Sequence, residues 1–226
     1  MKNKLFLSIY LGFSAFYLLI TAFNQEEIAR VLKPFLLPLL LVAVYFTEGF
    51  TTKKILLTAL LFSWIGDIIL LFADKGEIYF ILGLVAFLVS HVFYIVLFSK
   101  QTISKTISNK LSFGAGIGLI LLYFFGMITT LGPKLGPLTV PVVVYAVVIS
   151  TMLFFALKGS YQWKSIPYHF VLIGAVFFIS SDSILAFNKF YQPIPYASFL
   201  IMITYLAAQY GIVWGILNLN KKALSN

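Results

Sequence analysis

Two aspartates, Asp67 and Asp182, stand inside long apolar stretches of the sequence. Placing an ionised carboxyl group inside a membrane costs on the order of 3 kcal/mol or more unless the group faces a polar interior. Such a residue is therefore a candidate for function. Two carboxyl groups that face one cavity would hold different protonation states, which places a proton donor beside a base. The pair is therefore our catalytic candidate, and a purely structural role in a buried polar network is the alternative.

Further polar residues recur at helical spacing near these aspartates. Ser63 precedes Asp67 by one turn, and Gly174, which precedes Asp182 on its face, is expected to leave space beside that carboxyl. For one of the additional candidates, His91, a satisfied hydrogen bond between helices explains the residue equally well, and for Tyr145 a structural role is favoured. The additional candidates, which would hold water, substrate or the carboxyl groups, are His91, Tyr94, Tyr145, Ser181, Tyr205 and Gln209.

The composition requires a membrane to surround these residues. Of the 226 residues, 61% are hydrophobic and 10% are charged, and the mean hydropathy is +1.01. Soluble domains carry roughly 25% charged residues. Because backbone groups in lipid must be satisfied internally, the long apolar runs predict an all-α polytopic bundle of about eight helices. The net charge of +9 is scattered between apolar segments, which argues against a nucleic-acid partner.

We expect one transmembrane domain over residues 1–226. Pro34 and Pro38 are expected to shorten or kink the second span. Lys2 and Lys4 precede the first apolar run as in a signal peptide, but we interpret this run as a retained helix because no convincing cleavage site follows. The predicted spans lie near 5–23, 31–46, 55–72, 78–98, 111–131, 137–157, 166–187 and 196–217.

The basic residues predict the orientation of these spans. With both termini on one side, 11 of the 16 Lys and Arg residues fall on that side and 5 on the other. Basic residues concentrate in cytoplasmic loops, so we expect a multi-pass protein of a bacterial cytoplasmic membrane with both termini in the cytoplasm. The minority group is Arg30, Lys33, Lys75, Lys134 and Lys189.

The segments around the two aspartates resemble each other. Residues 66–72 and 181–187 share Asp, Ile, Leu and Phe in register at an offset of 115 residues. This offset spans four helices, as in two parallel four-helix halves related by an axis along the membrane normal. Chance similarity between apolar helices is the alternative.

Several other chemistries are excluded or disfavoured. The chain has no cysteine, and it lacks the Gly-x-Ser-x-Gly and His-Glu-x-x-His patterns. Two histidines on different helices make a poor transition-metal site. We therefore expect no metal and no cofactor.

Four motifs in order resemble the YhhN-like family of integral membrane lysoplasmalogenases. They are residues 62–70, residues 83–87 followed by 90–94, residues 174–183 with Asn188 just after them, and residues 205–209. The resemblance implies hydrolysis of the vinyl ether bond of a lysophospholipid by water, giving a fatty aldehyde and a glycerophospho-headgroup. It also adds Asn188 to the candidates that would hold water, substrate or the carboxyl groups.

Two rival functions remain open at this point. Paired acids inside a membrane also form proton relays, so a proton-coupled transporter is the main alternative. A noncatalytic membrane scaffold is the second alternative, in which both aspartates are structural. The expected partners of the hydrolase are the lysophospholipid, water and the bilayer.

Overall fold

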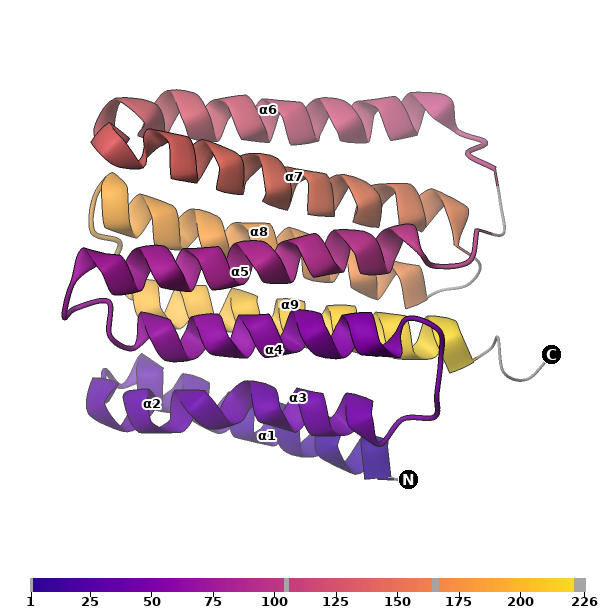
Figure 1. The fold of residues 1–226 in the computed structure, drawn as a ribbon, viewed down its shortest axis with the longest axis horizontal. Helices are drawn as coiled ribbons and strands as arrows, with labels where there is room; N and C mark the ends of the chain where they lie inside the picture. Colours follow the sequence, from indigo (N-terminus) through magenta and orange to yellow (C-terminus); the bar gives the residue numbers. More distant parts are fainter. Residues whose placement is uncertain (1, 104–105, 164–166, 222–226) are drawn as a thin grey trace. The chain divides into compact units, whose positions relative to one another are not determined.

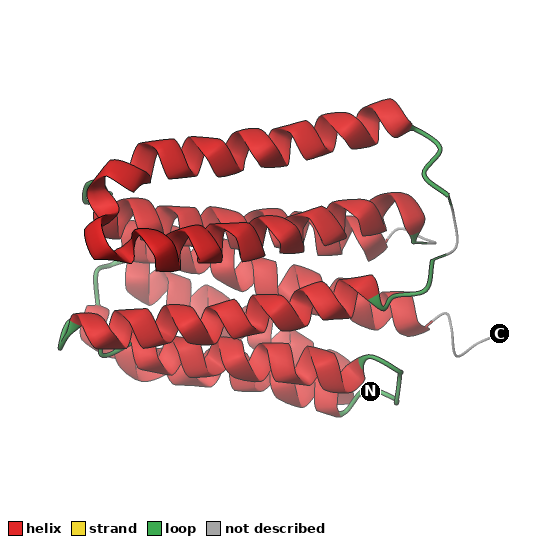
Figure 2. Cartoon of the chain, turned by 45° about the horizontal axis from the view of Figure 1, so that its top comes forward, coloured by secondary structure: helices red, strands yellow, loops and turns green. Residues whose placement is uncertain are grey.

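The computed structural model describes residues 2–103, 106–163 and 167–221, and these residues are helical apart from short connections, with no strand among them (Figure 2). Six helical segments in this part of the chain are long and apolar enough to cross a membrane. One of them, Lys110–Gln162, contains two helices joined by a short 3-10 turn. The predicted all-α fold is confirmed, and the chain is a multi-pass integral membrane protein.

The described chain divides into two compact units, residues 1–97 and residues 98–226. This division falls at the end of the fourth predicted span. Each unit thus holds four of the eight expected crossings, whereas the expectation of a single domain stays a prediction.

The first unit contains five α-helices and one 3-10 turn (Figure 1). Within it, α1 packs on α3 and α3 packs on α4. A ring contact joins α4 to α5, because the rings of Phe62 and Phe93 stack with their centroids 5.9 Å apart. The elements are α1 (Lys2–Ala22), α2 (Glu26–Leu32), η1 (Lys33–Phe35), α3 (Leu36–Tyr45), α4 (Lys53–Leu70) and α5 (Glu77–Ser99).

The predicted second span is one helical segment with a break. The 3-10 turn η1 separates α2 from α3 at Pro34, which confirms the expected effect of the prolines. Pro38 has no N–H to donate to the carbonyl of Pro34, four residues earlier. The indole Nε1 of Trp64 in α4 donates a hydrogen bond to that carbonyl instead, at 2.8 Å. The break is therefore satisfied by a side chain of a neighbouring helix.

The second unit is a succession of helices in which neighbours in sequence pack together (Figure 1). Residue Ile166, where the predicted seventh span begins, lies outside the described residues. Three lysines of the charge count, Lys105, Lys164 and Lys222, lie outside them as well. The elements are α6 (Lys110–Leu135), η2 (Gly136–Leu138), α7 (Thr139–Gln162), α8 (Pro167–Phe190) and α9 (Ala197–Lys221).

Small residues bring α8 and α9 into close contact. A Cβ atom added at Gly174 would lie 2.9 Å from the backbone oxygen of Ala208, and one added at Gly211 would lie 3.0 Å from the oxygen of Phe170. Neither helix could approach so closely with larger residues at these positions. The space that Gly174 itself leaves is therefore filled by α9, and the expectation of space beside Asp182 stays a prediction.

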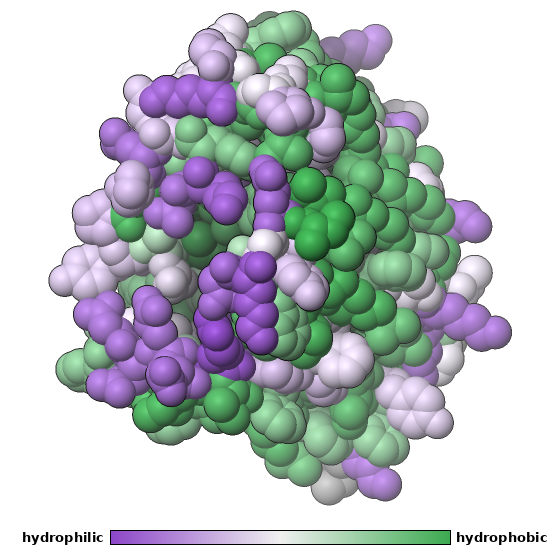
Figure 3. Space-filling view, turned by 60° about the vertical axis from the view of Figure 1, so that its left-hand side comes forward, coloured by the Kyte–Doolittle hydropathy of each residue, from purple (hydrophilic) through white to green (hydrophobic). Residues whose placement is uncertain are grey.

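The surface agrees with a membrane environment. Large hydrophobic side chains are exposed along α6, including Leu111 at 87% and Leu122 at 70%. A view coloured by hydropathy shows broad areas of hydrophobic residues between groups of hydrophilic ones (Figure 3). Exposed apolar area of this extent is expected of helices that face lipid.

Candidate functional site

Asp67 lies near the end of α4 and is paired with a lysine of the first unit. Its Oδ1 is 3.4 Å from Nζ of Lys33, and the two side chains are 4% and 16% exposed. Lys33 opens the 3-10 turn at Pro34, so the break in the second span positions this cation. The partly buried ammonium group of Lys33 compensates in part for the hydration that the buried carboxylate of Asp67 has lost.

Hydroxyl groups connect α4 and α5 one turn before Asp67. The hydroxyls of Ser63 and Ser90 are hydrogen-bonded at 2.7 Å, and Ser90 also donates to the backbone oxygen of Ala59 at 2.8 Å. The next residue, His91, is fully buried, as is Tyr94 one turn later. Ser63 thus contacts α5 at Ser90, the residue directly before the candidate His91.

The first helix carries two buried tyrosines that we did not single out in the sequence. Tyr10 and Tyr17 of α1 are 1% and 4% exposed. They lie seven residues apart, which places them on one face of α1.

A second ion pair lies one turn outward from Lys33. Nη2 of Arg30 is 2.8 Å from Oδ2 of Asp74, and both side chains are more than half exposed. The hydrogen bond from Arg30 lowers the pKa of the Asp74 carboxyl. Because water and salt screen such a pair, it contributes little to stability compared with a buried pair.

Asp182 lies in α8 of the second unit and accepts a hydrogen bond from α7. The phenol of Tyr145 donates to its Oδ2 at 2.6 Å. The neighbouring residue Ser183 is hydrogen-bonded to the phenol of Tyr123 in α6 at 2.8 Å. Two tyrosines from two helices therefore reach consecutive residues of α8.

The other candidates of this unit lie between α8 and α9 or in the connection that follows α8. Ser181 donates to the backbone oxygen of Ile201 at 3.0 Å. Asn188 accepts a hydrogen bond from the backbone N–H of Ile194 at 2.9 Å, which ties the connection to α8. Tyr205 is 3% exposed and meets the ring of Phe178 edge to face at 5.6 Å, and Gln209 is fully buried.

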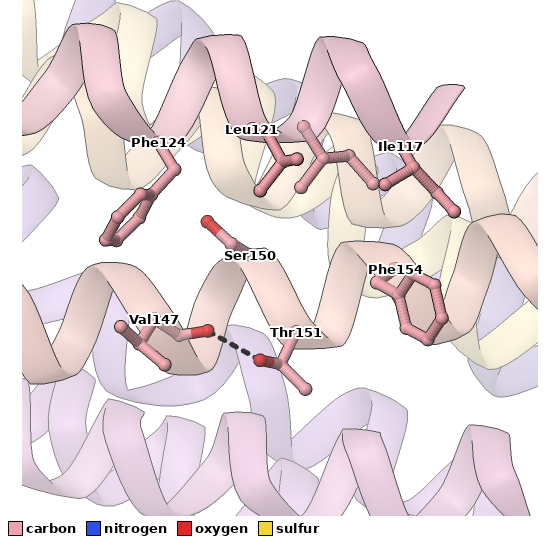
Figure 4. Close-up of a pocket in the computed structure, with 8 residues that line it drawn as sticks. Ile117, Leu121, Phe124, Val147, Ser150, Thr151 and Phe154 are labelled. Carbon is pink, nitrogen blue, oxygen red and sulfur yellow. Dashed lines mark hydrogen bonds between the residues drawn. The ribbon is translucent and has the colours of Figure 1, made fainter. Parts of the chain in front are cut away.

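An apolar groove of about 280 Å³ lies between α6 and α7 (Figure 4). Seven of its lining side chains are labelled in Figure 4, including Leu121 and Phe124 of α6 and Val147 of α7. Ser150 of α7 also lines it, and among the described residues its buried hydroxyl has no hydrogen-bond partner. Tyr145 does not line this groove, so the contact with Asp182 is made elsewhere on α7.

Within the described ranges, no group of three or more His, Asp or Glu side chains could hold a metal ion. The residues around Asp67 and Asp182 instead supply hydroxyls, one ammonium group and two carboxyls. Such groups can donate, accept and hold protons, and they can orient a water molecule.

Comparison with known proteins places the chain in a family. The model of the YhhN family matches residues 28–216, which include Lys33 and both aspartates. The chain belongs to the YhhN family.

The YhhN-family chain is similar to animal proteins named as lysoplasmalogenases. It is 36% identical to human lysoplasmalogenase TMEM86A over 157 residues, which cover 66% of this chain and 60% of that protein. It is 34% identical to the bovine TMEM86A protein, with the same two coverages. It is 30% identical to human lysoplasmalogenase TMEM86B over 71% of this chain and 62% of that protein. The chain thus spans about 60% of the length of these curated relatives, and no solved structure gave a significant match.

Besides the two tyrosines of α1, sequence reasoning missed Lys33 and Tyr123, which contact the candidate region of this YhhN-family protein. Lys33 was counted only as a topology charge, and Tyr123 was not singled out. The signal for Lys33 was its position directly before Pro34, within the predicted second span. For Tyr123 the only signal was a hydroxyl within an apolar helix, because the helical pattern does not identify the facing residue.

Proposed function

We propose that this YhhN-family protein is a membrane hydrolase that cleaves the vinyl ether bond of lysoplasmalogens. The observation that carries the proposal is the similarity to relatives named lysoplasmalogenase. The family match, over residues 28–216, includes both aspartates. None of the relatives reported above is named as a transporter. The substrate is a lysophospholipid with an alkenyl chain, and water is the second reactant.

The reaction needs a proton donor, an anion and a water molecule. Protonation of the β-carbon of the vinyl ether forms an oxocarbenium ion, and water adds to its α-carbon and loses a proton. The resulting hemiacetal breaks its bond to the glycerol oxygen, which takes up a proton, and a fatty aldehyde is released. We propose that Asp67 and Asp182 are the two catalytic carboxyl groups, as in the paired-carboxylate logic of glycoside hydrolysis.

The surrounding polar residues would orient these groups. Tyr145 supports this role through its hydrogen bond to Asp182, and Ser63 is supported by its place one turn before Asp67. We assign the same supporting role to His91, Tyr94, Ser181, Tyr205 and Gln209. Asn188 is retained as a candidate, although its contact with Ile194 favours a role in the α8–α9 connection.

The test is fatty aldehyde release from a lysoplasmenyl lipid by the purified protein in detergent. We expect aldehyde from the wild type and a loss of about 10²–10⁴-fold in Asp67→Asn and Asp182→Asn, which is the usual contribution of general acid catalysis. Asp74→Asn is the matched control, because this acid is exposed and paired with Arg30. A folded wild type that releases no aldehyde from either the ethanolamine or the choline lipid would reject the proposal.

The orientation is a further part of the proposal. We infer a bacterial cytoplasmic membrane with both termini in the cytoplasm, supported by the division of 11 and 5 basic residues. Because the chain has no cysteine, single cysteines introduced at Lys75 and Thr102 can be labelled without background. An impermeant maleimide added to intact cells should label the variant at Lys75 and not the variant at Thr102, and the reverse pattern would invert the topology.

A further inference from the structure

We propose that Lys33 is a positioning residue that holds Asp67 in its carboxylate form, so that Asp67 supplies the anion of the reaction and Asp182 the proton. The assignment of the two parts rests on the proposed function. The state of Asp67 itself does not, because it follows from the ion pair between Nζ and Oδ1 at 3.4 Å.

Burial is what gives this ion pair its effect. The side chain of Asp67 is 4% exposed, so water contributes little to the stabilisation of its charge. A carboxyl group in such a place takes up a proton unless a cation or several hydrogen-bond donors lie beside it. Lys33 supplies the cation from a helix that runs next to α4, and its own side chain is 16% exposed.

The backbone around Lys33 fixes the position of this cation. Lys33 is the first residue of η1, and the carbonyl of the next residue, Pro34, accepts the hydrogen bond from Trp64. Trp64 and Asp67 are three residues apart on α4 and therefore project from neighbouring positions of one face. The helix that carries the carboxylate thus also holds the turn that carries its counter-ion.

An ionised Asp67 decides the direction of proton transfer. A carboxylate cannot donate the proton that the β-carbon of the vinyl ether needs, but it can stabilise the oxocarbenium ion and accept a proton from the attacking water. In the proposed pair the donor is then Asp182, which becomes a carboxylate in the first step. When the hemiacetal collapses, the proton that water gave to Asp67 passes to the glycerol oxygen, and the hydroxyl proton of the hemiacetal passes to solvent. Solvent then restores the proton of Asp182.

A merely structural Lys33 would stabilise the fold without setting the charge of Asp67. Infrared difference spectroscopy separates the two roles, because a protonated carboxyl group has a carbonyl band that a carboxylate lacks. Spectra of purified wild type, Asp67→Asn, Lys33→Met, Lys33→Arg and the double variant Lys33→Met with Asp67→Asn would be compared. Arg30→Gln is the matched control, because it removes the neighbouring cation of the exposed pair.

We expect Asp67→Asn to remove no protonated-carboxyl band from the wild-type spectrum. Lys33→Met should gain such a band, and the double variant should lose it again, whereas Lys33→Arg and Arg30→Gln should show no new band. In the aldehyde assay, Lys33→Met should lower kcat at least about tenfold with a smaller effect on KM, and Lys33→Arg should restore most of the activity.

Two spectral results would overturn the inference. A protonated-carboxyl band in the wild type that disappears in Asp67→Asn would show that Asp67 is neutral beside Lys33. A folded Lys33→Met protein without a new band would show that the lysine is not what keeps Asp67 ionised. If Lys33→Met does not fold, the comparison of wild type with Asp67→Asn still decides the charge of Asp67. An inactive wild type would reject the proposed hydrolase and leave the spectral result intact.

Discussion

The phenol of Tyr145 donates a hydrogen bond to Oδ2 of Asp182 across 2.6 Å, and this contact joins α7 to α8 at one of the two candidate carboxyl groups. Removal of the donor should change the proton affinity and the orientation of the carboxyl group together. A single hydrogen bond is worth about 0.5–1.5 kcal/mol net, so Tyr145→Phe should lower kcat about 2–10-fold.

The second tyrosine of this region is the matched control for Tyr145. Tyr123→Phe also removes one phenol hydroxyl, but this hydroxyl bonds to Ser183 and not to a carboxyl group. Rates of aldehyde release measured at saturating substrate should therefore fall more in Tyr145→Phe than in Tyr123→Phe. Equal losses would mean that the contact with Asp182 has no special role in the reaction.

The close approach of α8 and α9 makes a prediction about stability. Gly174→Ala places a methyl group 2.9 Å from the backbone oxygen of Ala208, and a backbone atom cannot move aside as a flexible side chain can. We expect a loss of roughly 1–3 kcal/mol, the usual cost of overpacking. The measurement is the thermal midpoint of the purified protein in one detergent.

Gly118→Ala is the control for this substitution. No atom lies within 4 Å of a Cβ added at Gly118, which is also inside a helix. Here alanine should stabilise the helix by about 0.5–1 kcal/mol because the unfolded chain loses flexibility. A midpoint that falls equally in both variants would contradict the steric explanation.

The positions of the helices along the chain could be predicted much better than the partners of the polar groups. Apolar runs of about twenty residues located the spans, and Pro34 located the break in the second one. The pattern did not show that Trp64 would satisfy the carbonyl of Pro34. The helical pattern predicts on which face of its helix a residue lies. Which residue of the neighbouring helix it contacts depends on how the two helices are rotated and shifted against each other.

Lys33 illustrates the same limit for charges. Its place before an apolar run is typical of a topology signal, and the positive-inside rule uses only this one-dimensional information. The ion pair with Asp67 depends on a 3-10 turn and on a residue 34 positions later in the sequence. Gly174 shows the same limit for packing. A missing side chain can indicate either close approach of another helix or empty space, and only the position of α9 decides between them.

The hydroxyl of Ser150 predicts a stabilising substitution. It is buried and has no hydrogen-bond partner among the described residues, and an unsatisfied buried polar group costs about 1–3 kcal/mol. Ser150→Ala should therefore raise the thermal midpoint. Thr151→Ala is the control, because this hydroxyl donates to the backbone oxygen of Val147 at 2.7 Å (Figure 4). A lower midpoint in Ser150→Ala would mean that the hydroxyl is bonded in the membrane.

Substitutions at Asn188 test whether a candidate residue that came from the family resemblance has a structural role. Its side-chain oxygen accepts from the N–H of Ile194, so Asn188→Ala should lower the thermal midpoint. Asn188→Asp keeps an acceptor at the same place and should restore most of the stability. The rate of aldehyde release per folded molecule should change little in either variant. A large fall in kcat for a stable Asn188→Asp protein would instead support a direct role in the reaction.

The pairing of Lys33 with Asp67 also constrains how the protein is made. The ribosome completes Lys33 before Asp67, and at about 5–20 residues per second the intervening 34 residues take roughly 2–7 s. During this interval the lysine has no carboxylate from α4, and a lone ammonium group is costly inside lipid. The second span must therefore wait near the headgroups, or remain within the insertion machinery, until α4 follows. Biogenesis of this unit is thus expected to release the two spans into the bilayer together.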